Sequence, residues 1–214
     1  MKIYSFPTFN AGKILLTAEE LGLEYEWVQI DLSKGEHKSE EHLARHPMGK
    51  VPVLEYEGQY YIESNSICRL LARLNGDRLY SSDAATAARI DAWVDTMASH
   101  TGRWLGALLF EETVKAKFMG VDPDPKTLDE AHGYLTDQLP LLEKTLAGHA
   151  YLAGDSLTIA DTIAANYFYT TEFTTVDLST YPSLAAWYQG IRTRPSFERM
   201  LALSPTGAMV PFAK

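Results

Sequence analysis

Residues 49–67 carry the sequence GKVPVLEYEGQYYIESNSI, in which two short apolar runs precede a polar serine-rich segment. Aromatic and β-branched residues fill both runs, and Glu57-Gly58 between them favours a tight turn, so the pattern predicts strands over 51–56 and 59–62. Ser64 is a residue type that favours helix starts, and we expect it to cap a helix directly after the second strand. The stretch therefore predicts a β-hairpin that leads straight into a helix.

The sequence upstream of this hairpin alternates between strand and helix patterns. Strand-forming residues occur at Ile3, Tyr4 and over 25–30, and an apolar stripe at helical spacing between them ends at Gly22. The order strand, helix, strand, then hairpin and helix is typical of a thioredoxin-like fold. We therefore expect an α/β domain over residues 1–76.

After the first domain only helical patterns remain. A polar linker over 77–83 leads into apolar stripes of helical period, which predict an all-helical domain over 84–214. Pro140 lies inside one predicted helix, where proline costs about 3 kcal/mol, so we expect a kink or a restart there. Thr158 and Asp161 have the spacing of a capping box. The sequence thus predicts a thioredoxin-like domain followed by a helical bundle.

The composition is that of a globular protein with an acidic surface. The 214 residues carry a formal net charge of -9, which disfavours nucleic acid and anionic membranes as partners. No apolar run reaches the ~18 residues of a membrane span, and the N-terminus lacks the apolar core of a signal peptide. The single cysteine, Cys68, cannot form an internal disulfide. We expect a cytoplasmic protein.

Four stretches, taken in order, resemble the cytosolic glutathione S-transferases. They are Gly49 to Leu54, Glu63 to Ile67, Leu157 to Asp161, and Tyr181 to Trp187 ahead of Arg194-Pro195. The run over 4–10 is most similar to bacterial nu-class enzymes and also to the transferase-like domain of elongation factor 1 gamma, whereas His37-Lys38 is similar to the phi class. The resemblance covers nearly the whole chain. It implies the glutathione transferase fold, glutathione as co-substrate without a metal, and a homodimer formed through the first two helices of the helical domain.

The resemblance also implies how glutathione binds. In relatives the Val51-Pro52 bond is cis, and the Val51 backbone pairs with the cysteinyl part of glutathione like an added strand. Glu63 would accept from the γ-glutamyl ammonium, while Ser64 and the N–H groups of a helix N-terminus would hold its carboxylate. The candidate donors to the glycine carboxylate are His37, Lys38 and Lys50. Without the resemblance, the sequence would indicate only that Pro52 begins an edge strand and that Ser64 caps a helix.

Catalysis in such a site needs a donor that stabilises the glutathione thiolate over the thiol. Thr8 and Asn10, just before the first predicted helix, are the candidates, because a hydroxyl and an amide can each donate. The alternative is that Asn10 caps the helix and Thr8 shapes a turn. Tyr4 lies in the strand and is expected in the core. Cys68 is expected to be a buried structural thiol, which disfavours classes with a cysteine nucleophile.

The pocket for the second substrate is expected between the two domains. The candidates to line it, each of which could equally be core, are Trp104, Phe110, Tyr167, Phe173 and Pro211-Phe212. His42 and His46 have the spacing of zinc ligands, but no third ligand is evident, so no metal is expected.

Three functions fit these observations. The leading one is an enzyme, a glutathione transferase that activates the thiolate for attack on small hydrophobic electrophiles. The second is a nu-like glutathione-dependent disulfide-bond reductase or peroxidase that uses the same site. The third is a non-catalytic binding module, which is disfavoured because the chain is expected to end soon after the helical domain.

Overall fold

The computed structural model describes residues 1–204, 206, 208 and 209 of the chain. Its first part is built on a four-stranded sheet of order β2-β1-β3-β4, in which β1 is parallel to β2 and antiparallel to β3, and β3 is antiparallel to β4. The strands are β1 (Lys2–Ser5), β2 (Glu26–Gln29), β3 (Val53–Tyr56) and β4 (Gln59–Tyr61). The predicted strand–helix–strand unit and the hairpin are both confirmed, and the fold is thioredoxin-like here.

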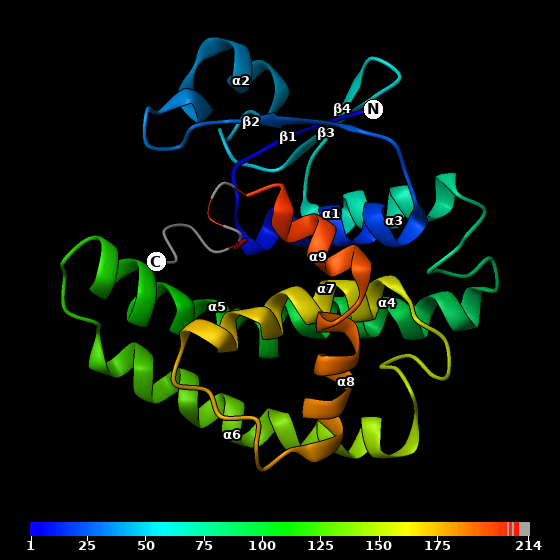
Figure 1. The fold of residues 1–214 in the computed structure, drawn as a ribbon, viewed down its shortest axis with the longest axis vertical. Helices are drawn as coiled ribbons and strands as arrows, with labels where there is room; N and C mark the ends of the chain where they lie inside the picture. The colour runs from blue at the N-terminus through cyan, green and yellow to red at the C-terminus, as the bar shows by residue number, and fades with distance from the viewer. Residues whose placement is uncertain (205, 207, 210–214) are drawn as a thin grey trace.

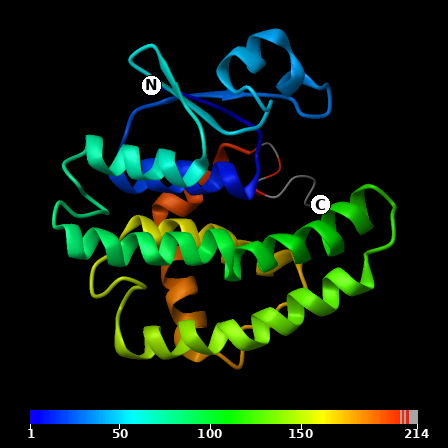
Figure 2. The same ribbon diagram turned by 180° about the vertical axis from the view of Figure 1, so that it is seen from behind.

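Helices cover both sides of this sheet (Figure 1). Two of them, α1 (Phe9–Leu21) and α3 (Ser64–Leu74), lie side by side between the sheet and the rest of the molecule, as Figure 2 shows from behind. The short helices η1 (Glu36–Lys38) and α2 (Glu40–Arg45) lie on the far side. The face of α1 and α3 that points away from the sheet is therefore free to pack on the second part of the chain.

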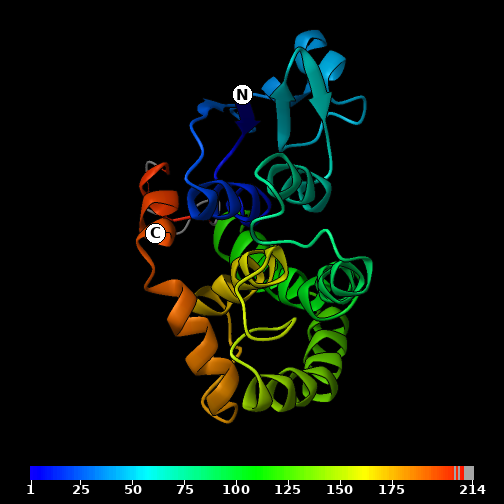
Figure 3. The same cartoon turned by 90° about the vertical axis from the view of Figure 1, so that its right-hand side faces the viewer.

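The second part contains helices alone among the residues that the structure describes. They are α4 (Ala84–Ser99), α5 (Thr101–Leu108), the π-helical η2 (Leu109–Phe118), α6 (Pro125–Gly148), α7 (Ile159–Phe168), η3 (Tyr169–Phe173), α8 (Pro182–Arg192) and α9 (Pro195–Ala202). The predicted helical bundle is thus confirmed. Seen from the side, α7 runs through the middle of these helices, and α9 returns to the side of α1 (Figure 3). No helix among the described residues is long and apolar enough to cross a membrane.

Two local features differ from what was expected: the restart at Pro140 does not occur, and Ser64 does not cap a helix. The helix at Pro140 neither ends nor restarts, because Pro140 and Thr136, whose carbonyl loses its partner, both lie on the exposed face, where water can replace the lost hydrogen bond. Ser64 is the first residue inside α3 rather than its cap. The cap position belongs to Glu63, whose side chain makes no capping bond.

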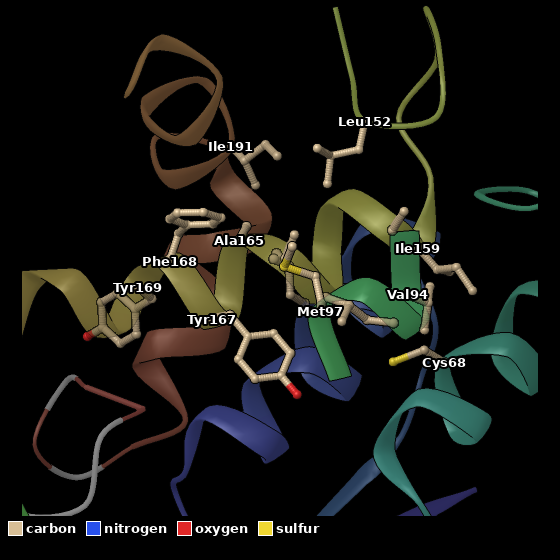
Figure 4. Close-up of a cluster of buried hydrophobic side chains, with 14 of the residues drawn as sticks. Cys68, Val94, Met97, Leu152, Ile159, Ala165, Tyr167, Phe168, Tyr169 and Ile191 are labelled. Carbon is tan, nitrogen blue, oxygen red and sulfur yellow. The ribbon is translucent and has the colours of Figure 1, made fainter. Parts of the chain in front are cut away.

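The core of the helical part is organised around α7. All ten of its residues are buried, and Figure 4 shows its aliphatic and aromatic side chains packed among Met97, Val94 and Cys68 from neighbouring helices. The approach to α1 is close, since a Cβ atom on Gly12 would lie 2.1 Å from Oδ1 of Asn166. The helix is therefore the surface on which both parts of the molecule meet.

A buried carboxylate fixes the start of α7. Asp161 is fully buried and accepts four hydrogen bonds, from the backbone N–H of Leu152 and Thr158 (2.9 Å each), the Thr158 hydroxyl (2.9 Å) and the indole of Trp187 (3.1 Å). Burial raises the pKa of this carboxyl. The predicted capping box is confirmed, and it also ties the preceding loop and α8 to the same residue.

The Asp161→Asn variant tests this anchor. An amide offers one acceptor oxygen in place of two, and in either orientation its nitrogen meets at least one N–H group that can only donate, so we expect the free energy of unfolding to fall by about 2–4 kcal/mol. Urea denaturation measures it. Asp83→Asn is the matched control, since Asp83 caps α4 at the surface and asparagine caps as well as aspartate. An Asp161→Asn loss no larger than that of the control would contradict the role of Asp161.

Candidate glutathione site

Two adjoining cavities open where the sheet part meets η2 and the end of α5. The larger measures about 340 Å³ and the smaller about 200 Å³. Asn10, Lys50 and Val51 border both, so the two cavities form one continuous site. The larger cavity is also bordered by Thr8, Phe9, Leu32, His37, Lys38, Gly49, Gly106, Leu109, Phe110 and Val114, and the smaller by His46, Pro52, Glu63 and Ser64.

All nine residues that the sequence nominated border this site. The catalytic candidates Thr8 and Asn10 lie at the start of α1. Val51 and Pro52 precede β3, and the peptide bond between them is cis. The other five are His37 and Lys38 in η1, Lys50 directly before Val51, and Glu63 and Ser64 at the start of α3.

The structure differs from the prediction at the start of α1. Thr8, not Asn10, is the cap, and its Oγ1 accepts a hydrogen bond of 3.2 Å from the backbone N–H of Ala11. The capping alternative for Asn10 is therefore wrong, because Asn10 already lies inside the helix. Its Oδ1 accepts instead from Nζ of Lys13 at 2.8 Å.

The start of α3 is an uncapped helix end that faces the smaller cavity. Its cap residue, Glu63, has a φ of 67°, a left-handed conformation that side chains rarely adopt. No side chain in the described part of the chain caps the first N–H groups of this eleven-residue helix. These donors and the positive end of the helix dipole are available to an anion next to the Glu63 carboxylate.

The opposite end of the site is cationic. Lys38 donates to the backbone carbonyl of Met48 at 3.1 Å, and Lys50 is exposed at the rim. Nδ1 of His37 is buried and has no hydrogen-bond partner among the described residues. Gly49 is needed beside them, because its φ is 59° and a Cβ atom there would lie 2.6 Å from the His37 carbonyl oxygen.

The two histidines of the zinc-like pair have separate structural roles. His42 is buried, and its Nε2 lies 2.8 Å from the backbone carbonyl of Lys50. His46 borders the smaller cavity, where burial lowers its pKa, and its Nδ1 accepts from the Met48 N–H at 3.3 Å. Within the described part of the chain no cluster of three or more candidate ligands could hold a metal.

The sequence analysis did not predict that Lys13 lies next to the site. This lysine is 2% exposed, and its Nζ donates to Oδ1 of Asn10 and to the hydroxyl of Tyr167 at 2.7 Å. Burial lowers its pKa to about 7. The spacing of three residues from Asn10 was a signal that both lie on one helix face. The burial itself could not be seen, since it depends on α7.

Of the aromatic residues expected to line the apolar pocket, Phe110 does so. Trp104 instead stacks on Tyr134, and Phe173 packs edge-on against Tyr169. Tyr167 is buried on Lys13, and Pro211-Phe212 lie outside the described residues. The apolar residues that the sequence did not nominate are Phe9, Leu32, Leu109 and Val114.

Two groups excluded from the site are indeed buried away from it. Tyr4 donates to Glu55 at 2.6 Å, and burial together with this carboxylate raises its pKa to about 12. Cys68 is fully buried in α3, and burial raises its pKa to about 11. The structural interpretation of this thiol is confirmed.

Comparison with known families gives two matches. Residues 1–73 match the family model described as glutathione S-transferase, N-terminal domain, and residues 107–195 match the model described as glutathione S-transferase, C-terminal domain.

Individual relatives extend over almost the whole chain. Glutathione S-transferase 1 of Zea mays is 34% identical over 213 residues, which cover 97% of this chain and 99% of the relative. The probable glutathione S-transferase GSTF2 of Oryza sativa is 33% identical over 207 residues, covering 95% and 96%. The maize glutathione S-transferase I solved with an atrazine glutathione conjugate superimposes with a TM-score of 0.89 at 33% identity and covers 99% of both chains. These relatives are plant phi-class enzymes, so the nu-class part of the resemblance is not supported.

The strained backbone at Glu63 can be tested by stability. Glycine adopts a φ of 67° without the clash of a Cβ atom, so Glu63→Gly should raise the free energy of unfolding by about 1 kcal/mol. Glu63→Gln keeps the strain and should leave stability within about 0.5 kcal/mol. Glu57→Gly makes the same replacement at another residue of positive φ, 50°, in the hairpin turn. It lies away from the site and is the matched control. Thermal and urea unfolding measure all three, and a Glu63→Gly protein less stable than the parent would contradict the strain.

Proposed function

Because this chain belongs to the glutathione S-transferase family, we propose that the two adjoining cavities form its glutathione site and that Thr8 and Asn10 stabilise the thiolate. The chain is a glutathione transferase, an enzyme that uses glutathione as co-substrate. The observation that carries the site assignment is the opposite charge at the two ends of one continuous cavity. Glu63 lies at one end, and His37, Lys38 and Lys50 lie at the other.

This arrangement of charge matches the glutathione molecule. The γ-glutamyl end carries an ammonium and a carboxylate side by side. Glu63 accepts from the ammonium, while the Ser64 hydroxyl and the uncapped N–H groups of α3 hold the carboxylate. The glycine carboxylate then lies at the cationic end, where the unpartnered Nδ1 of His37 and the two lysines can donate. Both ends of the tripeptide find complementary charge.

The middle of glutathione falls at the junction of the cavities. Val51 borders both cavities directly before β3, so its backbone N–H and C=O can pair with the cysteinyl residue as an added strand would. The cysteinyl sulfur then lies beside Asn10, which borders the same junction, and near Thr8.

Thr8 is suited to donate to the sulfur. Its Oγ1 is engaged as an acceptor by the Ala11 N–H, and a hydroxyl has one hydrogen left to donate. A charge-assisted hydrogen bond to the sulfur is worth about 1.5–3 kcal/mol, or roughly one to two units in the pKa of the bound thiol. The thiolate would then be populated near neutral pH.

The apolar wall of the larger cavity receives the second substrate. Phe9, Leu109, Phe110 and Val114 form this wall next to the proposed sulfur position. In the transfer step the thiolate attacks an electrophilic carbon, a C–S bond forms, and the leaving group departs with its bonding electrons. The solved maize relative with an atrazine conjugate supports a small aromatic electrophile. The named relatives are transferases, so we propose transfer rather than disulfide reduction.

The Thr8→Ala and Asn10→Ala variants test the catalytic assignment. Each should raise the pKa of enzyme-bound glutathione by about one unit and lower kcat more than it weakens binding, because the lost hydrogen bond favours the thiolate. The pH-dependent ultraviolet absorbance of the bound thiolate measures the shift. Turnover with an activated aryl chloride gives kcat, and a small alkyl disulfide tests the alternative reaction.

One control separates catalysis from capping. Thr8→Ala also removes a helix cap, at about 1 kcal/mol of stability. Asp83→Ala removes the equivalent cap of α4 and should leave the thiol pKa unchanged. If Thr8→Ala, Asn10→Ala and the double variant all leave the titration unchanged, backbone donors alone hold the thiolate and the assignment is wrong.

We also predict a homodimer located in the cytoplasm and formed through the first two helices expected in the helical domain, which correspond to the continuous stretch α4–α5 and to α6. Family membership supports the dimer, as do the partly exposed Trp93 on α4 and Leu74 at the end of α3. Sedimentation velocity at micromolar concentration should show one species of twice the chain mass. A monomer across the whole concentration series would overturn the dimer.

A further inference from the structure

Lys13 is a buried ionisable residue that the mechanism above does not use. It lies in the middle of α1 and is 2% exposed. Among the described residues no carboxylate lies within ion-pairing distance of its ammonium. A buried ammonium without a carboxylate partner is an unfavourable group, so its contacts decide what it can do.

Those contacts come from two helices. On α1, Nζ donates to Oδ1 of Asn10 at 2.8 Å. On α7, it donates to the Tyr167 hydroxyl at 2.7 Å and lies 3.9 Å from the centroid of that ring. Figure 4 shows this hydroxyl directed toward α1. The ring of Phe9 lies on the cavity side, with its centroid 5.4 Å from Nζ. Lys13 is therefore held between Asn10 and the core.

The ammonium dictates which atom of Asn10 turns inward. Burial lowers the pKa of Lys13 to about 7, so the ammonium form prevails below neutral pH. An ammonium donates hydrogen bonds and accepts none, so it pairs with the amide oxygen and not with the amide nitrogen. The side-chain amide is planar, and Nδ2 then points away from Lys13. Nδ2 makes no hydrogen bond within the described residues, and Asn10 borders both cavities. The free donor is available on the cavity side.

Without Lys13 the amide has two orientations of similar shape. In one, Nδ2 donates to the sulfur. In the other, Oδ1 faces the sulfur and its lone pairs repel a thiolate. We propose that Lys13 is a positioning residue that acts through Asn10: its ammonium holds Oδ1, so that Nδ2 is presented to the glutathione sulfur. This inference rests on the proposed role of Asn10 as a thiolate donor.

The other ionisable groups around Lys13 do not compete for this role. Burial raises the pKa of Tyr167 to about 12 and that of Cys68 to about 11, so both are neutral near pH 7. Glu63, at the start of α3, is the charged group that acts on Lys13 from a distance. The orientation of Asn10 is thus set by the direct contact with Lys13.

A double-mutant cycle of Lys13→Met and Asn10→Ala tests the proposal in the full-length enzyme with bound glutathione. Methionine keeps the length and apolar stem of lysine but cannot donate. We expect Lys13→Met to raise the pKa of the bound thiol by about one unit and to lower kcat about tenfold with little change in KM for glutathione. In the Asn10→Ala background, Lys13→Met should cause no further shift, because its target is already gone.

Two further variants complete the design. Tyr167→Phe is the matched control, since it removes a buried hydrogen bond of Lys13 without touching Asn10, and it should leave the thiol pKa unchanged. If Lys13→Met does not fold, Lys13→Leu replaces it. A leucine side chain cannot donate to Oδ1 of Asn10 either, so it should raise the thiol pKa as methionine does.

The outcomes distinguish the two proposals. No shift in Asn10→Ala removes Asn10 as a donor, and the inference falls with it. A shift in Asn10→Ala without one in the Lys13 variants overturns the inference alone. Additive shifts in the double variant show that Lys13 acts through its charge and not through Asn10, which also overturns positioning.

Discussion

The structure depends on the fully buried helix α7 and on the carboxylate that fixes its start. Asp161 accepts four hydrogen bonds, from its own capping residue, from the preceding loop and from α8. A charge this deep is tolerated because each oxygen has two donors. Because its first turn is held in place, α7 packs one face on α4 and another on α1. The contact with α1 fixes how the two parts of the molecule lie against each other. The Thr17 and Thr162 hydroxyls, 2.8 Å apart, lie across that contact.

The geometry of the candidate site depends on this contact. Asn166 lies so close to α1 that position 12 has no room for a side chain, and Tyr167 on the next position meets Lys13. The start of α1, with Thr8 and Asn10, is thereby held between the sheet and the helical core. Strain is placed on the other wall of the site, at Glu63, where a left-handed backbone carries a charged residue next to an uncapped helix. The zwitterion that we propose for this site needs such exposed donors and charges, which would be unfavourable in a core.

Much of this arrangement could be predicted from local sequence. The hairpin over 51–62 and the capping box at Thr158 and Asp161 are local signals, because each depends on residues within a few positions of one another. The nine candidate site residues were nominated through a family resemblance. The errors have local physical causes too. Pro140 does not break α6, since the lost hydrogen bond faces water, and Ser64 does not cap α3, since Glu63 takes a conformation that its residue type does not favour.

The sequence by itself determined the order of strands and helices, the thioredoxin-like and helical halves, and the set of polar residues that could meet a glutathione molecule. It did so because periodicity, turn residues and caps act within one or two turns of chain. The tertiary structure alone decided that Lys13 is buried against Tyr167, that Phe9, Leu109 and Val114 rather than Trp104 line the apolar wall, and that the two cavities join at Asn10. Each of these facts is a contact between segments that are distant in the chain, and no pattern along one segment reports the burial that another provides.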